Sequence, residues 1–514
     1  MGTMSTNDAD RADLESKDKD SLVQIATALG GKPSGRARKS EIIDLILDLA
    51  REDGNGSESQ NEQKNQEDSA QENRDKDSDQ QASGKNRGYS ADPMADARAE
   101  ANGDNEDRSG DDAQDGAGRK RRRRGRSREG MEEWAGEPVA AEGYLDLRDD
   151  GYGFLRVNGF LPSRDDVYVP VKFVRQFGLR KGDHLIGAYR PANRSEKNPA
   201  MLRLDSINGV EATNLPERAE FTELTPVFPD TKLKLERSED PENTISRVVD
   251  LLSPIAKGQR ALLVAPIRSG KTAILKEISQ SIETNYSEVK QLVLLVDAPP
   301  EEATEMKRWL TSSDVVASTF DQPPDEHIAI AELTIERAKR MVEMGDDVVV
   351  IVDGMTHLAR AYTLVSQGAG RLISGEIDAS ALYPPKRFFG AGRKVEEGGS
   401  LTVIATVLSE TKSRMDELVL NELQGGSTME LHLCSEAVDA QLFPGVNVRK
   451  SMTKNEGSLY SNGEYAQIMK LREALKGVSS EGDSLSELRT LLDEVKNTDD
   501  NAELIDKLGA RDKK

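Results

Sequence analysis

The chain has 514 residues and a net charge of −22, with 92 acidic side chains against 70 lysines and arginines. This length allows two or three domains with full cores, and the acid excess excludes a nucleic-acid-binding face that covers the whole surface. A single cysteine excludes a disulfide framework. The sequence has no apolar run of 18 residues and its N-terminus is polar, which predicts a cytoplasmic protein without a signal peptide or membrane contact.

Residues 10–51 form the first predicted unit, a small helical module. Apolar residues recur at helical spacing over 22–29 and 42–49, and glycines at 30, 31 and 35 separate the two stretches. A helix pair of this kind either docks another protein or makes a weak contact with nucleic acid.

Residues 52–138 are predicted to be a disordered acidic linker, because they contain almost no large apolar side chains. Within it, residues 119–128 read R-K-R-R-R-R-G-R-S-R. Such a basic run attracts phosphates without reading base sequence. It predicts either RNA contact or a tail that folds back on the acidic linker.

Residues 139–212 are predicted to fold as a small OB-type β-barrel, because five short β-like segments occur between glycine, aspartate and proline residues. Residues 150–156 read D-G-Y-G-F-L-R, which places Tyr152 and Phe154 on one face of a strand next to Arg156. Such aromatic side chains stack on the bases of single-stranded nucleic acid, and Asp166 and Tyr168 are expected in the same cleft. The alternative is that both rings belong to the barrel core.

Residues 213–508 are predicted to form an α/β domain with a mostly parallel sheet, since strand-like and helix-like segments alternate. Residues 261–272 read A-L-L-V-A-P-I-R-S-G-K-T, and a helical pattern follows. A strand, a tight loop, G-K-T and a helix make a P-loop, although Ala265 stands where the general pattern has glycine. The predicted phosphate-binding residues are Pro266, Ile267, Arg268, Ser269, Gly270, Lys271 and Thr272.

A second apolar run, V-V-V-I-V-D at residues 348–353, follows the P-loop by about eighty residues. It is typical of a Walker B strand, and Asp353 at its end would hold Mg²⁺ together with Thr272. The two motifs predict ATP and Mg²⁺ as cofactors, with Lys271 on the β- and γ-phosphates. A chance G-K-T at a helix start is the alternative.

The order of these units resembles the bacterial transcription termination factor Rho family, in a form similar to its actinobacterial branch. The resemblance rests on strings such as D-G-Y-G-F-L-R, A-P-I-R-S-G-K-T, P-K-R-F-F-G-A-G-R and V-E-E-G-G-S-L-T, and it covers residues 140–500 closely and 10–51 weakly. It implies a RecA-like ATPase domain, a homohexameric ring, single-stranded RNA as ligand and RNA polymerase as a partner. It also implies Phe443 beside the adenine, and pore loops at 370–375 and 409–414 with Arg371 and Arg414 toward RNA.

Several positions depart from the family pattern. The family has Asp-Glu-Arg-Pro where residues 297–300 read D-A-P-P, so Ala298 replaces the glutamate that activates water. Lys454 aligns with the arginine that reaches the γ-phosphate of a neighbouring subunit, and lysine lacks its planar fork. Further departures are His357 for an arginine, Asn198 for an RNA-cleft tyrosine, and Glu376 and Lys412 for pore-loop glycines.

These departures predict that ATP binding persists while hydrolysis is slow, because the phosphate loop and metal residues are intact. Asp297 or Glu301 as a substitute base, or an alignment error of one residue, are the alternatives. Two functions follow. One is an RNA-dependent ATPase and helicase that moves along nascent RNA and releases RNA polymerase. The other is a hydrolysis-deficient relative that mixes into the ring of an intact Rho.

Overall fold

The structure is a computed structural model that describes residues 136–193, 196–240, 243–366, 379–478 and 484–511, together with Leu22, Lys39, Ile43 and Ile46. All four of these N-terminal residues are helical, and all but Lys39 are buried. The remainder of the predicted N-terminal module, the acidic linker, the basic run and the loop at 370–375 lie outside the described residues. No helix in the described part of the chain is long and apolar enough to cross a membrane.

A closed β-barrel follows residue 138. Its strands are β1 (Val139–Leu147), β2 (Gly153–Arg156), β3 (Val167–Val169), β4 (His184–Arg190) and β5 (Ala200–Ile207), with β6 (Val210–Glu211) added at one edge. The strand order is β3-β2-β1-β4-β5, and a parallel pairing of Tyr168 with Ala200 closes the ring between β3 and β5. The five predicted strands and the OB-type barrel are confirmed, and helix α4 (Val171–Phe177) was not predicted.

The ATPase part is built on one sheet with the strand order β12-β11-β13-β15-β10-β16-β17. The parallel strands are β10 (Arg260–Pro266), β11 (Lys290–Ala298), β12 (Asp314–Thr319), β13 (Asp347–Asp353), β15 (Ser400–Ser409) and β16 (Met429–His432). The short β17 (Met452–Thr453), β14 (Arg393–Val395) and β7 (Pro226–Val227) pair antiparallel at its margins, and β8 (Lys232–Leu233) pairs with β9 (Ile255–Ala256) separately. The predicted, mostly parallel α/β sheet is therefore confirmed.

Successive side chains along each central strand pack alternately into two different hydrophobic cores. Leu263 and Ile351 face one core, whereas Leu262 and Val350 face the other. The first core is covered by α5 (Thr244–Leu252), α6 (Lys271–Asn285), α7 (Pro300–Trp309) and the C-terminal helices. The second is covered by α8 (Pro324–Glu343), α9 (Met355–Ser366), α10 (Ala379–Phe389) and α11 (Arg414–Gln424). Both faces are buried, which explains the continuous apolar runs in the sequence.

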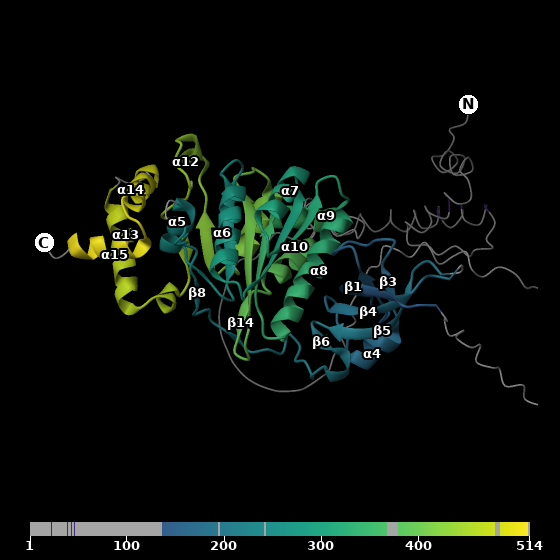
Figure 1. Cartoon of the computed structure of the whole chain (residues 1–514). Helices are drawn as coiled ribbons and strands as arrows, with labels where there is room; N and C mark the ends of the chain where they lie inside the picture. Colours follow the sequence, from purple (N-terminus) through teal and green to yellow (C-terminus); the bar gives the residue numbers. More distant parts are fainter. Residues whose placement is uncertain are drawn as a thin grey trace, which may run out of the picture. The chain divides into compact units, whose positions relative to one another are not determined.

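The chain ends in three helices, α13 (Asn462–Val478), α14 (Ser484–Lys496) and α15 (Asn501–Arg511), which Figure 1 shows grouped at the C-terminus. Leu471, Leu488 and Leu504 connect them to the first core. Helix α15 ends at Arg511, three residues beyond the predicted boundary of the α/β domain at 508. A short helix α12 (Ser435–Asp439) precedes this group.

Candidate nucleotide and nucleic-acid sites

The P-loop connects the carboxyl end of β10 to α6. Gly270 immediately precedes the helix at φ +80°, a left-handed conformation that glycine adopts without strain. Residues 266–272 all line one cavity of about 810 Å³, so the structure brings the predicted phosphate-binding residues together. Phe443 lies directly against Gly270, because a Cβ atom there would approach the phenyl ring to 2.8 Å. An adenine ring beside the loop would therefore find an aromatic face that is 41% exposed.

Lys271, which lines this cavity, forms an ion pair with the Walker B carboxylate. Lys271 Nζ lies 2.6 and 2.8 Å from the two carboxylate oxygens of Asp353. The hydroxyl of Thr406, on the neighbouring strand β15, also donates to Asp353 at 2.7 Å. A bound triphosphate would take Lys271 from Asp353, and that exchange would free a carboxylate oxygen for a magnesium-bound water.

The residues present fit a magnesium-nucleotide. The Ser269 hydroxyl is buried in the loop and has no hydrogen-bond partner within the described residues, so it is available to a phosphate oxygen. The Thr272 hydroxyl is 3.5 Å from Glu302 Oε2, at the weak limit of a hydrogen bond. No group of three or more His, Cys, Asp or Glu side chains that could hold a metal occurs in the described ranges. Magnesium would therefore share its coordination between Thr272, phosphate oxygens and water.

The position of the expected catalytic glutamate is occupied by a buried methyl group. Ala298 ends β11 and is 7% exposed within the first core. The preceding residue, Asp297, has φ +57°, and the pairing of β11 with β12 shifts register there as in a β-bulge. Its carboxylate lies 2.5 Å from Nδ1 of His357. Glu301, the other substitute base considered, is exposed in the first turn of α7.

Around the rim of the cavity lie charged residues that the sequence did not indicate. Arg360 donates to Asp416 at 2.6 Å, and the Thr411 hydroxyl donates to the same oxygen at 2.6 Å. Burial opposes the charge on Asp416, but these two hydrogen bonds lower its pKa below the ordinary value. With Glu302, Arg360 and Asp416 are charged cavity residues that sequence reasoning missed, whereas Thr411 belongs to the predicted loop at 409–414. Only Glu302 had a local signal, since it follows the P-P-E of the first helical turn after β11.

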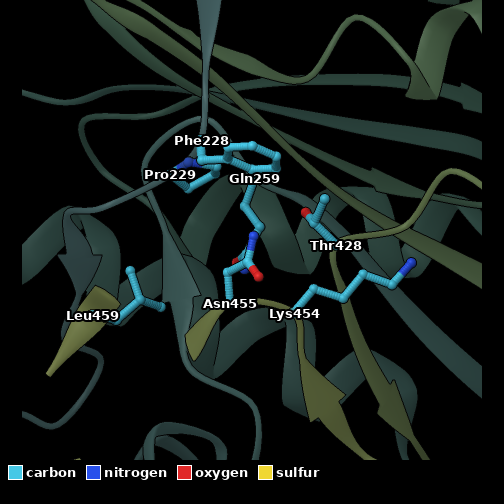
Figure 2. A pocket seen from close by; sticks show the side chains of 7 residues that line it. All are labelled: Phe228, Pro229, Gln259, Thr428, Lys454, Asn455 and Leu459. Carbon is cyan, nitrogen blue, oxygen red and sulfur yellow. The ribbon is translucent and has the colours of Figure 1, made fainter. Parts of the chain in front are cut away.

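Lys454 lies apart from the P-loop cavity. Its Nζ donates to the carbonyl oxygen of Ser427 at 2.7 Å. It lines a separate cavity of about 280 Å³ with Gln259, Thr428 and the exposed ring of Phe228, and Figure 2 shows its side chain extended alongside Thr428. Within one chain, Lys454 and Lys271 therefore do not belong to the same site.

Three aromatic rings form a cluster on the barrel. The ring centroids of Tyr152, Phe154 and Tyr168 are 5.6 to 6.2 Å apart, and all three rings are half-buried rather than part of the barrel core. This arrangement excludes the core alternative. The guanidinium of Arg156 lies 5.7 Å from the Phe154 ring.

Arg156 and Asp166 are buried beneath this cluster. Arg156 pairs with both Asp166 and Asp146, and Asp166 also accepts from the Ser163 hydroxyl at 2.7 Å. The side chain of Asn198 donates to the main-chain oxygen of Asp166 at 3.1 Å. The charges of Arg156 and Asp166 are therefore satisfied within the barrel and hold the aromatic cluster in place.

Of the two predicted pore-loop arginines, Arg371 lies outside the described residues. Arg414 is the exposed first residue of α11, whose amino end is capped by Ser413. Glu410 and Lys412, in the loop before it, have φ values of +60° and +59°. Thr411 and Ser413 line the P-loop cavity, so the predicted RNA loop and the nucleotide site share a boundary.

Comparisons with known proteins agree with this division of sites. Residues 141–213 match the family model for the Rho termination factor RNA-binding domain, and residues 246–453 match that for the ATP synthase alpha/beta family nucleotide-binding domain. A Pseudomonas aeruginosa protein named transcription termination factor Rho is 43% identical over 377 residues, which cover 73% of this chain and 89% of that protein.

The Micrococcus luteus protein of the same name is 46% identical over 381 residues, which cover 72% of this chain but 54% of the relative. The chain thus spans about half the length of this relative. A solved structure described as a prototypical ATPase from the type III secretion system of pathogenic bacteria aligns with a TM-score of 0.46 and 17% identity, over 55% of this chain and 86% of that one.

Proposed function

Because the chain belongs to the transcription termination factor Rho family, we propose that it is an RNA-binding, ATP-dependent translocase in which hydrolysis is slow. Single-stranded RNA binds first on Tyr152, Phe154 and Tyr168. It then passes through the centre of a homohexameric ring, where Arg371 and Arg414 contact it. The outcome of this movement is release of RNA polymerase from the nascent RNA in the cytoplasm.

ATP is held by residues 266–272, with Phe443 against the adenine and Lys271 on the β- and γ-phosphates. Thr272 and Asp353 hold Mg²⁺, which neutralises charge on the transferred phosphoryl group when it is bound. Three observations support this assignment: the cavity that residues 266–272 line, the contacts of Phe443 with Gly270 and of Asp353 with Lys271, and the unpartnered Ser269 hydroxyl.

The observation that supports slow hydrolysis is the alanine at position 298, Ala298. Its buried methyl group ends the strand beside Asp353, and alanine can neither orient water nor accept a proton. Lys454 adds to the defect, because an arginine supplied by a neighbouring subunit accelerates such reactions roughly 10³- to 10⁵-fold and a lysine does not reproduce its fork.

The same two positions favour a second candidate function, a protein that binds ATP and RNA but modulates the ring of an intact Rho. A subunit that holds nucleotide without cleaving it would stall a mixed ring. To distinguish this candidate from an independent translocase, the chain is mixed with an intact Rho. The mixed hexamer should then release phosphate more slowly than the intact Rho alone.

The test is RNA-stimulated phosphate release by the purified full chain, with cytidine-rich RNA and Mg-ATP. We expect slow release in the unaltered protein, and a rise of at least about tenfold when Ala298→Glu and Lys454→Arg are combined, since each restores a transition-state contact. Fluorescent ATP analogue binding, measured in parallel, should be the same in both proteins. Rapid turnover by the unaltered chain would contradict the proposal.

A further inference from the structure

We infer that His357, positioned by Asp297, is the base that removes a proton from the attacking water in this protein. This inference rests on the proposed ATPase function, and it explains how the chain could hydrolyse ATP without a carboxylate at position 298. Asp297, which precedes Ala298 at the end of β11, contacts His357 in the first turn of α9.

The bulge at the end of β11 is what brings Asp297 to this place. A regular strand would direct successive side chains to opposite faces of the sheet. Asp297 instead adopts φ +57° between Val296 and Ala298, where the pairing with β12 shifts by one residue. Aspartate tolerates this conformation better than most residues, and left-handed backbone of this kind is concentrated at functional sites.

The hydrogen bond between Asp297 and His357 fixes the imidazole. Asp297 Oδ2 lies 2.5 Å from Nδ1, so a carboxylate there accepts the Nδ1 proton and leaves Nε2 as the ring's acceptor. Nε2 has no hydrogen-bond partner within the described residues, and His357 lines the P-loop cavity with Lys271 and Thr272. The ring is 27% exposed, which leaves it accessible to a water molecule in that cavity.

A second histidine lies near Asp297. His327, in the first turn of α8, has Nε2 3.9 Å from Asp297 Oδ1 and Nδ1 2.6 Å from the Ser318 hydroxyl. Burial lowers the pKa of His327, so this histidine is neutral at pH 7. The carboxylate of Asp297 therefore pairs with His357 and not with a charged His327. A carboxylate, an oriented imidazole and an acceptor nitrogen facing a cavity form the usual arrangement of a general base.

Within the described residues, the charged groups of the cavity that His357 lines come from several elements. Asp297 lies at the end of β11, Arg360 and Asp416 form their own ion pair at the rim, and Glu302 projects from α7 near Thr272. The nearest cations are thus neutralised by partners: Arg360 by Asp416 and Lys271 by Asp353.

The chemical step balances without another reactant. The water oxygen forms a bond to the γ-phosphorus as the bond from that phosphorus to the bridging oxygen breaks, and its electrons remain on ADP. The water proton passes to Nε2 of His357, and the resulting imidazolium is balanced by Asp297. His357 then returns the proton to solvent, which leaves ADP and inorganic phosphate.

The experiment measures phosphate release by the full chain with Mg-ATP and cytidine-rich RNA, from about pH 5.5 to 8.5. The unaltered protein should lose activity as the pH falls, with a slope approaching tenfold per unit. His357→Gln should lower the rate by about 10²-fold at high pH and abolish the pH dependence. Asp297→Asn should lower the rate as well, because its amide favours the wrong tautomer of His357.

His184→Gln, which removes a histidine from the barrel, is the matched control and should leave the rate and pH profile unchanged. A fluorescent ATP analogue should bind the His357 variant within about threefold of the unaltered protein, which also reports folding. An unchanged rate or profile in His357→Gln, lost nucleotide affinity in that variant, or nucleotide binding without any hydrolysis in the unaltered chain would each overturn the inference alone. Failure of the unaltered chain to bind the analogue would instead overturn the proposed function.

Discussion

At the scale of single residues, Glu430 on β16 shows how buried hydrogen bonds make stability depend on pH. Its two carboxylate oxygens accept from the Ser427 hydroxyl at 2.6 Å, from Gln424 Nε2 at 3.0 Å and from His432 Nε2 at 2.9 Å. Burial would raise its pKa, but the hydrogen bonds from these three side chains outweigh it and lower the pKa to about 2. The charged form of Glu430 therefore stabilises the folded protein.

The first stability prediction concerns Glu430→Gln. The folded pKa is about 2 and the ordinary value is 4.5, so the stabilisation is complete above pH 4.5 and disappears as the pH falls toward 2. The shift corresponds to at most about 3 kcal/mol at pH 7. Urea unfolding of both proteins between pH 7 and pH 3 should show a difference in free energy of unfolding that shrinks with acid.

Glu422→Gln is a suitable control, because Glu422 is an exposed glutamate paired with Lys386. Its substitution should cost less than about 1 kcal/mol at any pH. A difference between Glu430→Gln and the unaltered protein that stays constant with pH would show that Glu430 acts through packing rather than charge.

The sequence predicted the residues of the nucleotide site that are contiguous, and missed those that tertiary structure adds. Lys271, Thr272 and Asp353 belong to recognisable local patterns, and all were predicted from spacing. Thr406 on β15 reaches Asp353 because the two strands are neighbours in the sheet, and Asp416 on α11 reaches the P-loop cavity through tertiary packing. The contact of Asp297 with His357 depends on a backbone bulge that no residue pattern indicates.

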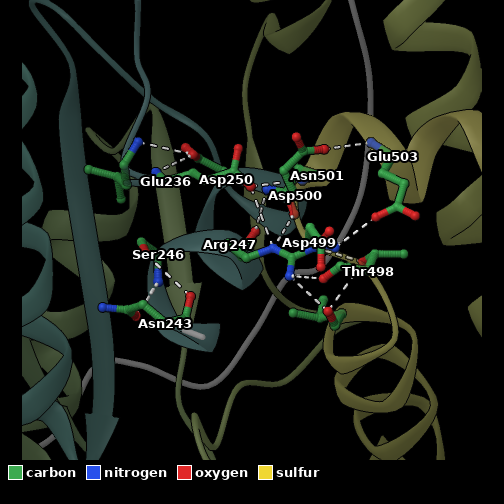
Figure 3. A network of polar contacts seen from close by, with 12 residues as sticks. Glu236, Asn243, Ser246, Arg247, Asp250, Thr498, Asp499, Asp500, Asn501 and Glu503 are labelled. Atoms are coloured by element: carbon green, nitrogen blue, oxygen red, sulfur yellow. Dashed lines mark hydrogen bonds and ion pairs between the residues drawn. The ribbon is translucent and has the colours of Figure 1, made fainter. Parts of the chain in front are cut away.

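At the scale of elements, a single arginine on α5 forms hydrogen bonds with the C-terminal helices. Arg247 on α5 is 2% exposed and donates to the main-chain oxygens of Val495 and Thr498 at 2.8 and 2.7 Å. It also donates to the side chains of Thr498 and Asn501, and Asn501 returns a hydrogen bond to the main chain of Arg247 (Figure 3). This network satisfies the carbonyl groups at the end of α14.

Arg247→Met should therefore destabilise the protein by about 3 kcal/mol or more, because several buried acceptors lose their donor at once. The measurement is the free energy of unfolding in urea, together with limited proteolysis between α14 and α15, which should become faster. Arg308→Met, at an exposed position of α7, should stay within about 0.5 kcal/mol of the unaltered protein. Equal stability of the two variants would contradict this role for Arg247.

The elements that the sequence predicted best are those with strong periodicity, and the ones it missed break the usual rules. Helix α10 contains Pro384 and Pro385, which on their own predict a turn, yet burial of Phe388 and Phe389 in the second core holds the helix together. Tertiary packing overrides local propensity at this place.

At the scale of the whole described molecule, α8 connects the barrel to the nucleotide site. This helix of 20 residues is about 30 Å long. At its amino end His327 faces Asp297, and toward its carboxyl end Arg337 donates to Asn208 of the barrel at 2.6 Å and lies over the ring of Tyr144. The backbone of the barrel also approaches α8 closely at Gly182. A Cβ atom at this position would lie 2.5 Å from the main-chain nitrogen of Arg337. The barrel thus contacts a helix that also reaches Asp297.

The last prediction tests this connection through the pair of Arg180, on the barrel, and Glu343, at the end of α8. Glu343 has no exposed side-chain surface. It accepts from Arg180 at 3.0 Å and from the Phe221 main chain at 2.9 Å, and it forms an ion pair with Arg340 at 2.9 Å. A double-mutant cycle with Arg180→Met and Glu343→Gln should give a coupling energy of about 1 to 3 kcal/mol in urea unfolding.

The neighbouring pair of Lys181 and Glu332 joins the same two parts of the fold but is longer, at 3.4 Å, and about a third exposed on both sides. The same cycle on this pair should give less than about 0.5 kcal/mol, because water and salt screen exposed charges. If the barrel is held by the buried pair, the Arg180 variant should also unfold in two separate thermal transitions. Equal coupling in both cycles, or one undivided transition, would show that α8 does not depend on this contact to hold the barrel.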